Sequence, residues 1–380
     1  MLLGKALRTW QLSTRCLLLM GQGLVWRGLA DEALPNHMNS FFTRFETHDF
    51  SSHISDVKQS LMPDDSAVID QERVLGLFKH IGVNRCPGPD GIWGRTLRSC
   101  SEQLSGVFQR LFQTSIATCT IPDIWKLSTV NLIPKKDNPK LPNGFRPIAL
   151  NSLVMKKLKE IIKFLILAVT ECNLDPLQSA YRSGRGVNDP KLFILNILYK
   201  HLEGPQTHAR ILFADFSSTF NTIQPHILAN KLVSYFSLDN HLVLWIIDFL
   251  TNRLQRVFVN GCFSELSLTC TGSPQGYVLS PLLYILYTDD CRSNHLNRFL
   301  VKFANDSALL SLLQGSEQHH GPALTESVDW SNNSYLDLNV TKTKEMIVDC
   351  RRQEHSPGKT IIHNNEVENV SKYEYLGTIF

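Results

Sequence analysis

The chain has 380 residues, of which 43% are apolar and 19% charged, a composition typical of a globular protein and not of a disordered one. The net charge is only +3, so the overall charge alone does not indicate a nucleic-acid partner. The nine cysteines are scattered, odd in number and without a C-x-x-C pair, which favours free thiols over a disulfide framework or a zinc site. No apolar run reaches the roughly 18 residues of a membrane span.

The first 75 residues show little organisation and are predicted to form a poorly defined leader, 1–75. Residues 1–30 contain basic but no acidic side chains around a Leu-rich stretch, a pattern that imitates a signal or transit peptide. The alternative is an unrelated leader joined to the domain that follows. Residues 31–75 are polar and weakly periodic, and we expect helix and loop there.

From residue 76 onward, segments with helical and with strand periodicity follow one another, which predicts an α+β fold. The alternating segment around Asn260-Gly261 predicts a β-hairpin. The predicted helices span 96–116, a Lys-rich segment up to about 169, 189–203, 225–250, an apolar segment within 273–291, and 322–335. The predicted strands span 128–136, 143–152, 209–223 (breaking into a helix), 299–304 and 344–350.

Positive charge is concentrated between Lys126 and Lys163, where nine basic residues and two acidic ones give a local net charge of +7. The end of this stretch, 156–163, is also consistent with a solvated helix face. The basic residues between Pro134 and Pro147 are less well explained in that way, so the stretch is interpreted as a nucleic-acid track. The pair His319-His320 lacks further metal ligands at suitable spacing and is predicted to lie in a loop.

Three polar sites interrupt apolar segments in the second half of the chain. In LFADFSSTF an apolar strand ends at Asp215, which offers the oxygen ligands that Mg²⁺ prefers, although a helix N-cap is favoured for this aspartate taken alone. In KFANDSALL, apolar stretches bracket Asn305 and Asp306, as in a hairpin with metal ligands at its tip or in a plain Asn-Asp turn. In GSPQGYVLSP, glycines and a proline hold Gln275 on a tight turn, which suits contact with a base or sugar and equally a plain loop.

The order and spacing of these segments, preceded by IPKK and FRPIALNS, resemble the reverse transcriptases of non-LTR (LINE-type) retrotransposons, especially the jockey-like elements of animal genomes. The similarity runs from about Asn84 to Phe380 and includes GPDGI, DPLQSAYRSGRG, LFADFSSTFNTI, SPQGYVLSPLLYILYTDD, LDLNVTKTKEMIVDCRR and YEYLG. It implies a right-hand polymerase, an RNA-directed DNA polymerase acting as a nucleotidyltransferase on an RNA template, a DNA primer and dNTPs. It further implies fingers at 76–208 with the 255–272 hairpin, and a palm at 209–380 that stops before the thumb.

The resemblance also assigns roles to single residues. Asp215 matches the first metal-binding aspartate of the family, Ala214 leaves a carbonyl near the ion, and Asn305 and Asp306 match the aspartate pair that with them would hold two Mg²⁺ ions. Phe220 falls where the family keeps a ring under the nucleotide sugar that excludes a 2′-hydroxyl, with core packing as the alternative. The remaining implied residues are the nucleotide-binding Lys135, Arg146, Gln275 and Gly276 and the catalytic Lys342. General attraction to a nucleic-acid backbone is the alternative for the first two, and an ordinary surface position for the last.

Asn305 departs from the family pattern, because it keeps an amide oxygen but lacks a negative charge. At an effective dielectric near 20, a pair of unit charges about 4 Å apart is worth about 4 kcal/mol, and the loss of a few kcal/mol slows a reaction roughly a thousandfold. The sequence therefore predicts a nuclear or cytoplasmic reverse transcriptase that is impaired in this copy, with Mn²⁺ as an alternative to Mg²⁺. A catalytically silent nucleic-acid-binding remnant of a degraded element is the second interpretation, and a structural α+β protein with accidental motifs is the third.

Overall fold

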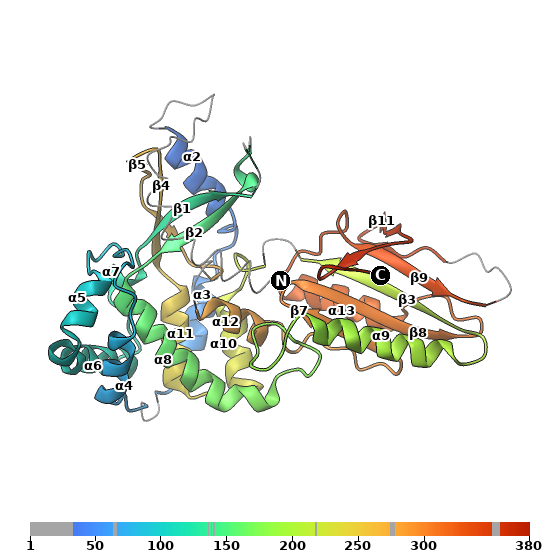
Figure 1. Ribbon diagram of the computed structural model, residues 1–380, viewed down its shortest axis with the longest axis horizontal. Helices are drawn as coiled ribbons and strands as arrows, with labels where there is room; N and C mark the ends of the chain where they lie inside the picture. The colour runs from blue at the N-terminus through green and yellow to red at the C-terminus, as the bar shows by residue number, and fades with distance from the viewer. Residues whose placement is uncertain are drawn as a thin grey trace. The chain divides into compact units, whose positions relative to one another are not determined.

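A computed structural model describes residues 33–380 apart from 64–66, 136, 138, 140, 217–218, 274–277 and 352–357. The chain divides into two compact units. Unit 1 comprises the residues up to Val169 together with Leu232–Ser280, and unit 2 comprises Thr170–Lys231 together with Pro281–Phe380. Both units combine helices with sheets, which confirms the predicted mixed fold (Figure 1).

Unit 1 contains a sheet of order β2-β1-β4-β5, in which β6 also pairs with β4. Its strands are β1 (Ser128–Pro134), β2 (Phe145–Leu150), β4 (Arg253–Val259), β5 (Cys262–Phe263) and β6 (Ser267–Thr269). Strand β1 is antiparallel to β2 and parallel to β4. Between β4 and β5, Asn260 and Gly261 have φ angles of 51° and 81°, the pattern of a type I′ turn, so the predicted hairpin is confirmed.

The helices of unit 1 enclose α11, which is apolar on nearly all sides. Of its eleven residues, nine are buried, as expected for a helix with no polar face. The indole of Trp245 is fully buried and donates a hydrogen bond of 3.1 Å to Ser115 Oγ on α6. The helices are α2 (Ala33–Phe42), α3 (Ser51–Ser60), α4 (Gln71–Lys79), α5 (Gly94–Ser99), α6 (Ser101–Ala117), α7 (Asp123–Lys126), α8 (Leu153–Thr170) and α11 (Asn240–Leu250), with a 3₁₀ turn at Pro142–Gly144.

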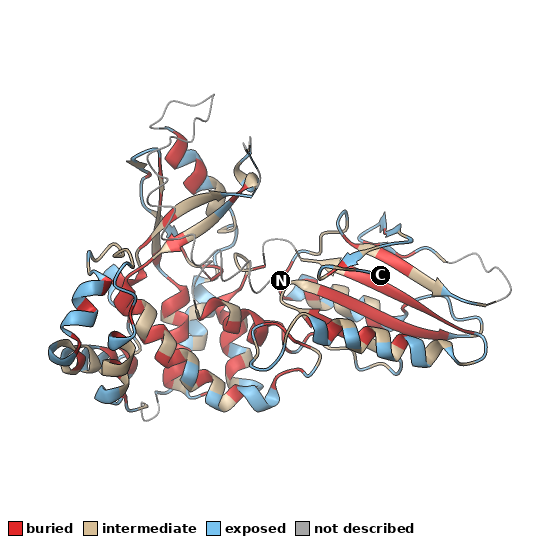
Figure 2. Ribbon diagram, in the orientation of Figure 1, coloured by how far each residue is buried: buried red, intermediate tan, exposed pale blue. Residues whose placement is uncertain are grey.

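Unit 2 is built on a sheet of order β12-β9-β3-β8-β7. Its strands are β3 (Thr207–Asp215), β7 (Arg298–Phe303), β8 (Asp306–Gln314), β9 (Lys344–Asp349) and β12 (Glu368–Asn369). Strand β3 lies at the centre, antiparallel to both β8 and β9, and its first seven residues are all buried. Figure 2 shows this buried band along β3 and β8. An apolar strand of this kind requires cover on both faces of the sheet.

Two helices supply that cover. On one face, Ile194 of α9 (Asn188–Leu202) packs with Phe213 of β3. On the other face, Ala323 of α13 (Pro322–Asn333) packs with Leu212. The remaining elements are α10 (Pro225–Ser234), α12 (Ser280–Tyr287), a 3₁₀ turn (Glu171–Asn173) and two small hairpins, β10 (Ile361–Ile362) with β11 (Asn365–Glu366) and β13 (Glu374–Tyr375) with β14 (Thr378–Ile379).

The helix predicted over 96–116 is divided at Cys100 into α5 and α6. Two further predicted helical segments differ from the structure. The strand expected to break into a helix within 209–223 ends at Asp215, and the next helix begins only at Pro225, whose ring suits the first turn of a helix. The helix expected over 225–250 is interrupted between α10 and α11, where Ser237 has a φ of 52° that a right-handed helix cannot contain. Apolar periodicity continues through both places, so it did not reveal either break.

A cluster of buried polar side chains crosses the α13 side of the unit 2 sheet. Arg210 of β3 binds Glu345 of β9 through two hydrogen bonds of 2.8 and 2.7 Å. Both ring nitrogens of His320 are hydrogen-bonded. Nδ1 bonds with Ser311 Oγ at 2.7 Å, and Nε2 bonds with Glu345 Oε1 at 2.9 Å. His320 lies in a loop, as predicted for the His319-His320 pair, but its side chain is buried in this cluster.

Within the described ranges, no helix is both long enough and apolar enough to cross a membrane. Eight cysteines lie in these ranges and all are free thiols, as the sequence predicts. Cys16 lies outside the described residues.

Candidate active site

Asp215 and Asp306 are direct cross-strand partners at one end of the unit 2 sheet. Asp215 is the last residue of β3, Asp306 is the first residue of β8, and their Cα positions pair in antiparallel register. Residues directly opposite one another in a sheet project from the same face. The two carboxylates therefore lie side by side, and both are only partly buried.

The turn that leads into Asp306 is tight and strained. Only Ala304 and Asn305 join β7 to β8, because Phe303 already pairs with Asp306. Ala304 has a φ of 56°, which costs roughly 1–2 kcal/mol for a residue with a Cβ. A positive φ at the first of two turn residues but not at the second is the mark of a type II′ hairpin turn, whose first position glycine normally occupies. Such strain persists only where the surrounding structure imposes the conformation.

The carboxylate pair carries more negative charge than its surroundings neutralise. Burial raises the pKa of Asp306, the charge of Asp215 raises it further, and Lys342 offsets part of the effect. The ammonium group of Lys342 lies 3.1 Å from Oδ2 of Asp215. The lysine side chain is 68% exposed, so solvent screens this ion pair. A further cation beside the pair would stabilise both charges.

Asn305 and Ala214 complete the predicted metal ligands. The Nδ2 atom of Asn305 lies 3.4 Å from Oδ1 of Asp306, so its amide directs a donor toward the carboxylate. Ala214 precedes Asp215 on β3, opposite Ser307. In the part of the chain that the structure describes, no three His, Cys, Asp or Glu side chains gather as a metal cluster. Carboxylate oxygens are donors that a hard cation such as Mg²⁺ prefers, and this pair has one charged ligand fewer than an aspartate at position 305 would provide.

Phe220 packs against Tyr284. Its ring centroid lies 5.3 Å from that of Tyr284, which is buried. Burial raises the pKa of Tyr284, and the charges of Asp306 and Asp215 add to this increase. Phe220 is only partly buried, so contact with Tyr284 leaves part of its ring available to a ligand.

Lys135 and Arg146 lie on one hairpin of unit 1. Arg146 is on β2 opposite Ile133, and Lys135 follows β1 with its amide bonded to Gly144 O at 2.8 Å. Because alternate residues of a strand share a face, the two basic side chains project to the same side of the hairpin. Both are exposed. Gln275 and Gly276, which the sequence predicts to contact the nucleotide, lie outside the described residues.

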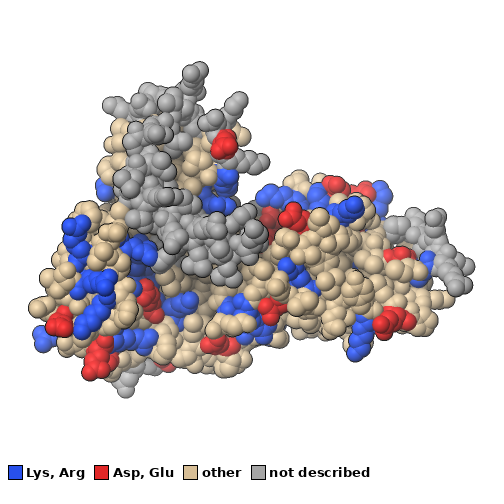
Figure 3. Space-filling model, viewed as in Figure 1, with Lys and Arg blue, Asp and Glu red and all other residues tan. Residues whose placement is uncertain are grey.

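The predicted basic track between Lys126 and Lys163 is not one continuous exposed surface. Lys126 is buried and pairs with Asp248 at 2.8 Å, and Lys159 is buried in the core of unit 1. Burial lowers the pKa of Lys156 to about 8 and that of Lys159 well below its ordinary range. Figure 3 shows basic and acidic side chains interspersed over the helices of unit 1 on the face in view. The formal local charge of the segment therefore overstates its surface charge, and the prediction of a solvated lysine face on this helix is wrong at Lys159.

Three side chains near the carboxylate pair received no role from the sequence pattern. Tyr373 stacks on Phe213 with ring centroids 4.2 Å apart, and burial together with the charges of Asp306 and Asp215 raises the pKa of Tyr373. Burial and the charge of Asp306 likewise raise the pKa of Tyr181. The Oε1 atom of Gln178 accepts a hydrogen bond from the Ala304 amide at 3.3 Å. The resemblance marked their segments, DPLQSAYRSGRG and YEYLG, without indicating which side chains face the pair.

Comparison with known proteins assigns this sequence to a family. The sequence profile described as "Reverse transcriptase (RNA-dependent DNA polymerase)" matches residues 133–380. The RNA-directed DNA polymerase from mobile element jockey of Drosophila funebris is 26% identical over 376 residues, covering 92% of this chain and 39% of the relative. The jockey polymerase of Drosophila melanogaster is 22% identical, covering 82% and 35%, and the probable RNA-directed DNA polymerase from transposon BS of the same species is 24% identical, covering 81% and 36%.

The chain thus spans between a third and two fifths of the length of these relatives. The match covers both strands that carry the carboxylate pair, and it includes Lys135 and Arg146. The chain belongs to the reverse transcriptase family and is a reverse transcriptase domain of the non-LTR retrotransposon type.

Proposed function

We propose that this domain is an RNA-directed DNA polymerase by descent, in which Asp215 and Asp306 hold two Mg²⁺ ions and Asn305 impairs catalysis. The observation that carries the proposal is the cross-strand register of Asp215 with Asp306, directly after a strained two-residue turn. On this proposal the unit 2 sheet is the palm and the β1–β2 hairpin of unit 1 belongs to the fingers. The division of the chain into fingers at 76–208 with the 255–272 hairpin and palm at 209–380 remains a prediction.

The bound metal ions would activate a primer 3′-hydroxyl and stabilise the leaving pyrophosphate. The residues of this chain have distinct tasks around that chemistry. Asp215 and Asp306 provide anionic oxygens, and Ala214 provides a backbone carbonyl at the end of β3. Lys342, which pairs with Asp215 at 3.1 Å, partly neutralises the carboxylates before a cation binds and holds a proton close to where pyrophosphate would leave.

The fingers residues would bind the incoming nucleotide. Arg146 presents a planar guanidinium that can bind a phosphate through two hydrogen bonds, whereas Lys135 acts as a point charge. The Lys135 ammonium group donates to the carbonyl of Asn143 at 2.8 Å, which holds the tip of that side chain against the hairpin. Phe220 would lie under the deoxyribose and exclude a ribonucleotide by steric conflict. The substrates on this proposal are an RNA template, a DNA primer and dNTPs.

Asn305 is the reason to expect impaired catalysis. It replaces a charge with a neutral amide beside the metal ligands, and a charge pair at this range is worth about 4 kcal/mol at an effective dielectric near 20. Mn²⁺ binds imperfect oxygen sites more readily than Mg²⁺, which demands near-ideal octahedral geometry. We therefore expect this copy to work better with Mn²⁺ than with Mg²⁺.

A second candidate function is nucleic-acid binding without catalysis. It is favoured by the amide donor that Asn305 directs at Asp306 and by the ion pair between Lys342 and Asp215, which together satisfy part of the carboxylate pair without metal. Both candidates require hybrid binding through the fingers. Changing Lys135 and Arg146 together to Ala should reduce the slope of log affinity against log salt for an RNA–DNA hybrid by up to about two. An unchanged slope, with Lys359→Ala as the control at an exposed lysine of unit 2, would rule out this hairpin as the binding surface.

Primer extension separates the two candidates. The chain, its Asn305→Asp variant and the Asn305→Asp/Asp215→Asn double variant are each given an RNA template, an annealed DNA primer and dNTPs, with Mg²⁺ or Mn²⁺. Asn305→Asp should raise extension by up to roughly a thousandfold, and Asp215→Asn should remove the gain. Asn297→Asp adds the same charge at the exposed opposite end of β7 and should change nothing. Background extension by a folded, hybrid-binding Asn305→Asp protein would leave only the non-catalytic candidate.

A further inference from the structure

The outer edge of the unit 2 sheet is covered close to the strained turn. Strand β7 is the edge strand, but Lys302 is bonded on its outer side through both backbone groups. Its N–H donates to Leu177 O at 2.9 Å, and its carbonyl accepts from Ser179 N at 3.1 Å. Gln178 lies between these bonds as a parallel bridge partner of Lys302. A short irregular segment therefore extends the sheet only two residues before Ala304.

The side chain of Gln178 reaches from this segment to the turn itself. Gln178 is 1% exposed, and its Oε1 atom accepts from the amides of Ala180 at 3.0 Å and Ala304 at 3.3 Å. One buried oxygen thus connects the segment to the residue of the turn with the least favourable backbone conformation. Because a left-handed alanine needs its surroundings to hold it, this bond acts where the turn most requires support.

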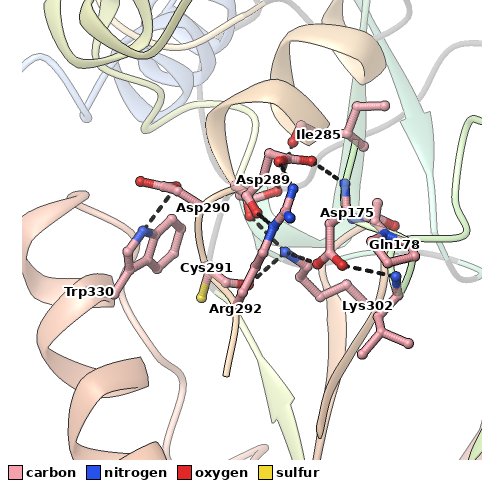
Figure 4. Close-up of polar contacts among 12 residues, drawn as sticks. Asp175, Gln178, Ile285, Asp289, Asp290, Cys291, Arg292, Lys302 and Trp330 are labelled. Carbon is pink, nitrogen blue, oxygen red and sulfur yellow. Dashed lines mark hydrogen bonds and ion pairs between the residues drawn. The ribbon is translucent and has the colours of Figure 1, made fainter. Parts of the chain in front are cut away.

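A buried ion pair between Lys302 and Asp175 also holds this segment in place (Figure 4). The side chain of Lys302 is 3% exposed. Its ammonium group has three partners, namely the carbonyl oxygens of Thr288 at 2.8 Å and Cys291 at 2.7 Å and Oδ2 of Asp175 at 2.9 Å. The Asp175 amide donates to Asp289 at 2.7 Å, and Asp289 pairs with Arg292. Two hydrogen bonds and one ion pair hold the ammonium group, so the start of the segment is fixed without help from Gln178.

We propose that residues 175–182 form a brace for the metal-binding hairpin, and that Gln178 is a positioning residue that sets Asp306 against Asp215. The brace rests on the proposed function, since it assigns a task to the hairpin that would hold the metal. Gln178 acts through the Ala304 amide and touches no reacting atom. Asn305 and Asp306 follow Ala304 directly, so a relaxed turn would carry both away from the register that pairs Asp306 with Asp215.

Metal affinity tests this role. With Mn²⁺ as the probe and Asn305→Asp as the background, the free ion is titrated by electron paramagnetic resonance. Gln178→Ala should weaken Mn²⁺ binding by about tenfold or more, the usual effect of removing a group that orients a metal ligand. Gln224→Ala is the matched control, at another buried glutamine of unit 2, whose side chain donates to the nearby carbonyl of Thr222, and it should leave Mn²⁺ affinity unchanged.

A second substitution distinguishes positioning from general packing. Glycine adopts a positive φ without strain, so Ala304→Gly should make the turn independent of the brace. Ala304→Gly is therefore expected to restore most of the Mn²⁺ affinity lost in Gln178→Ala. Failure of this rescue, with both proteins folded, would mean that Gln178 supports the unit in some other way and would overturn the positioning role. If the Gln178→Ala protein does not fold, Gln178→Asn is used in its place, because it shortens the side chain by one methylene and withdraws the same amide from Ala304.

Hydrogen exchange tests the brace apart from the function. In the chain that keeps Asn305, and without metal, Gln178→Ala should speed amide exchange of the turn at 303–307 and leave the centre of β3 protected. Unchanged exchange at the turn would overturn the brace. Faster exchange with unchanged Mn²⁺ affinity in the Asn305→Asp background would overturn the positioning role of Gln178. If Asn305→Asp binds no Mn²⁺ at all, the proposed function fails, and the exchange result alone decides whether residues 175–182 hold the turn.

Discussion

Two charged clusters share strand β3 and differ in how fully their charges are neutralised. Arg210 projects from one face and binds Glu345 through two short hydrogen bonds, and Glu345 also binds His320. Asp215 ends the same strand on the opposite face, beside Asp306, with the exposed Lys342 as the cation at 3.1 Å. The first cluster is closed inside the core, whereas the second has a negative excess and a partly exposed position.

The direction of the pKa shifts shows the same difference. Burial would raise the pKa of Glu345, but its hydrogen bonds to His320 and Arg210 outweigh burial and lower it. Burial and the neighbouring Asp215 both raise the pKa of Asp306, and Lys342 offsets only part of this. The charged form of Glu345, paired with Arg210, therefore stabilises the fold. The charged form of Asp306 destabilises it. Unfavourable charge of this kind is common at functional sites.

The largest effect is expected from breaking the closed cluster. Arg210→Ala would leave the carboxylate of Glu345 buried without its main partner, and the free energy of unfolding should fall by about 3–5 kcal/mol. Lys344→Ala, at the residue of β9 that precedes Glu345, breaks the ion pair with the exposed Glu368 and should cost less than about 1 kcal/mol. Urea unfolding measures both. Equal losses in the two variants would contradict the distinction between closed and exposed charges.

A smaller effect is expected from adding charge to the open cluster. Without divalent cations, Asn305→Asp places another carboxylate beside Asp306 and should lower the free energy of unfolding by about 1–2 kcal/mol. The substitution proposed to improve catalysis would therefore destabilise the metal-free fold. Thermal unfolding in EDTA checks this, with Asn297→Asp as the control. A metal-free Asn305→Asp protein as stable as the parent would show that the hairpin tolerates the charge without a cation.

The pH dependence should separate the clusters by the sign of their contributions. Burial lowers the folded pKa of His320 although Glu345 opposes this, so the contribution of His320 is fully present above about pH 6.5 and is lost as the pH falls. The folded pKa of Asp306 is raised, so its contribution is fully present below about pH 3.9 and is lost as the pH rises through the folded value. On acidification, His320→Gln should therefore lose less stability than the parent, and Asp306→Asn should lose more. Identical pH profiles for the three proteins in urea unfolding would contradict both assignments.

Much of the fold could be predicted because its signals are local. The Asn260-Gly261 turn follows from two residues that accept positive φ, and β3 follows from an apolar run that ends at an aspartate. The pairing of Asp215 with Asp306 could be expected from the resemblance but not from periodicity, since nothing local specifies which strands become neighbours. Arg210 and Glu345 are 135 residues apart, and each alone looks like an ordinary charged residue in a strand.

Burial of charged side chains was harder to predict than burial of apolar ones. Lys159 lies in a lysine-rich helix whose spacing is equally typical of a solvated face, yet it is buried against the ring of Phe249, 5.3 Å away. Gln178 and Lys302 carry no local mark of their roles, because both depend on a contact between segments distant in sequence. The sequence indicated which segments matter and left their side-chain contacts open.

The most direct test of the account is the stability of Asp306→Asn with and without Mn²⁺. If the open cluster is built for a cation, removing its charge in EDTA should raise the free energy of unfolding by about 1 kcal/mol, the scale of a charge pair at a partly exposed site. In saturating Mn²⁺ the order should reverse, because the cation binds and stabilises the parent more than the variant. A variant that is less stable than the parent by the same amount in both conditions would contradict the claim that Asp215 and Asp306 form a cation site.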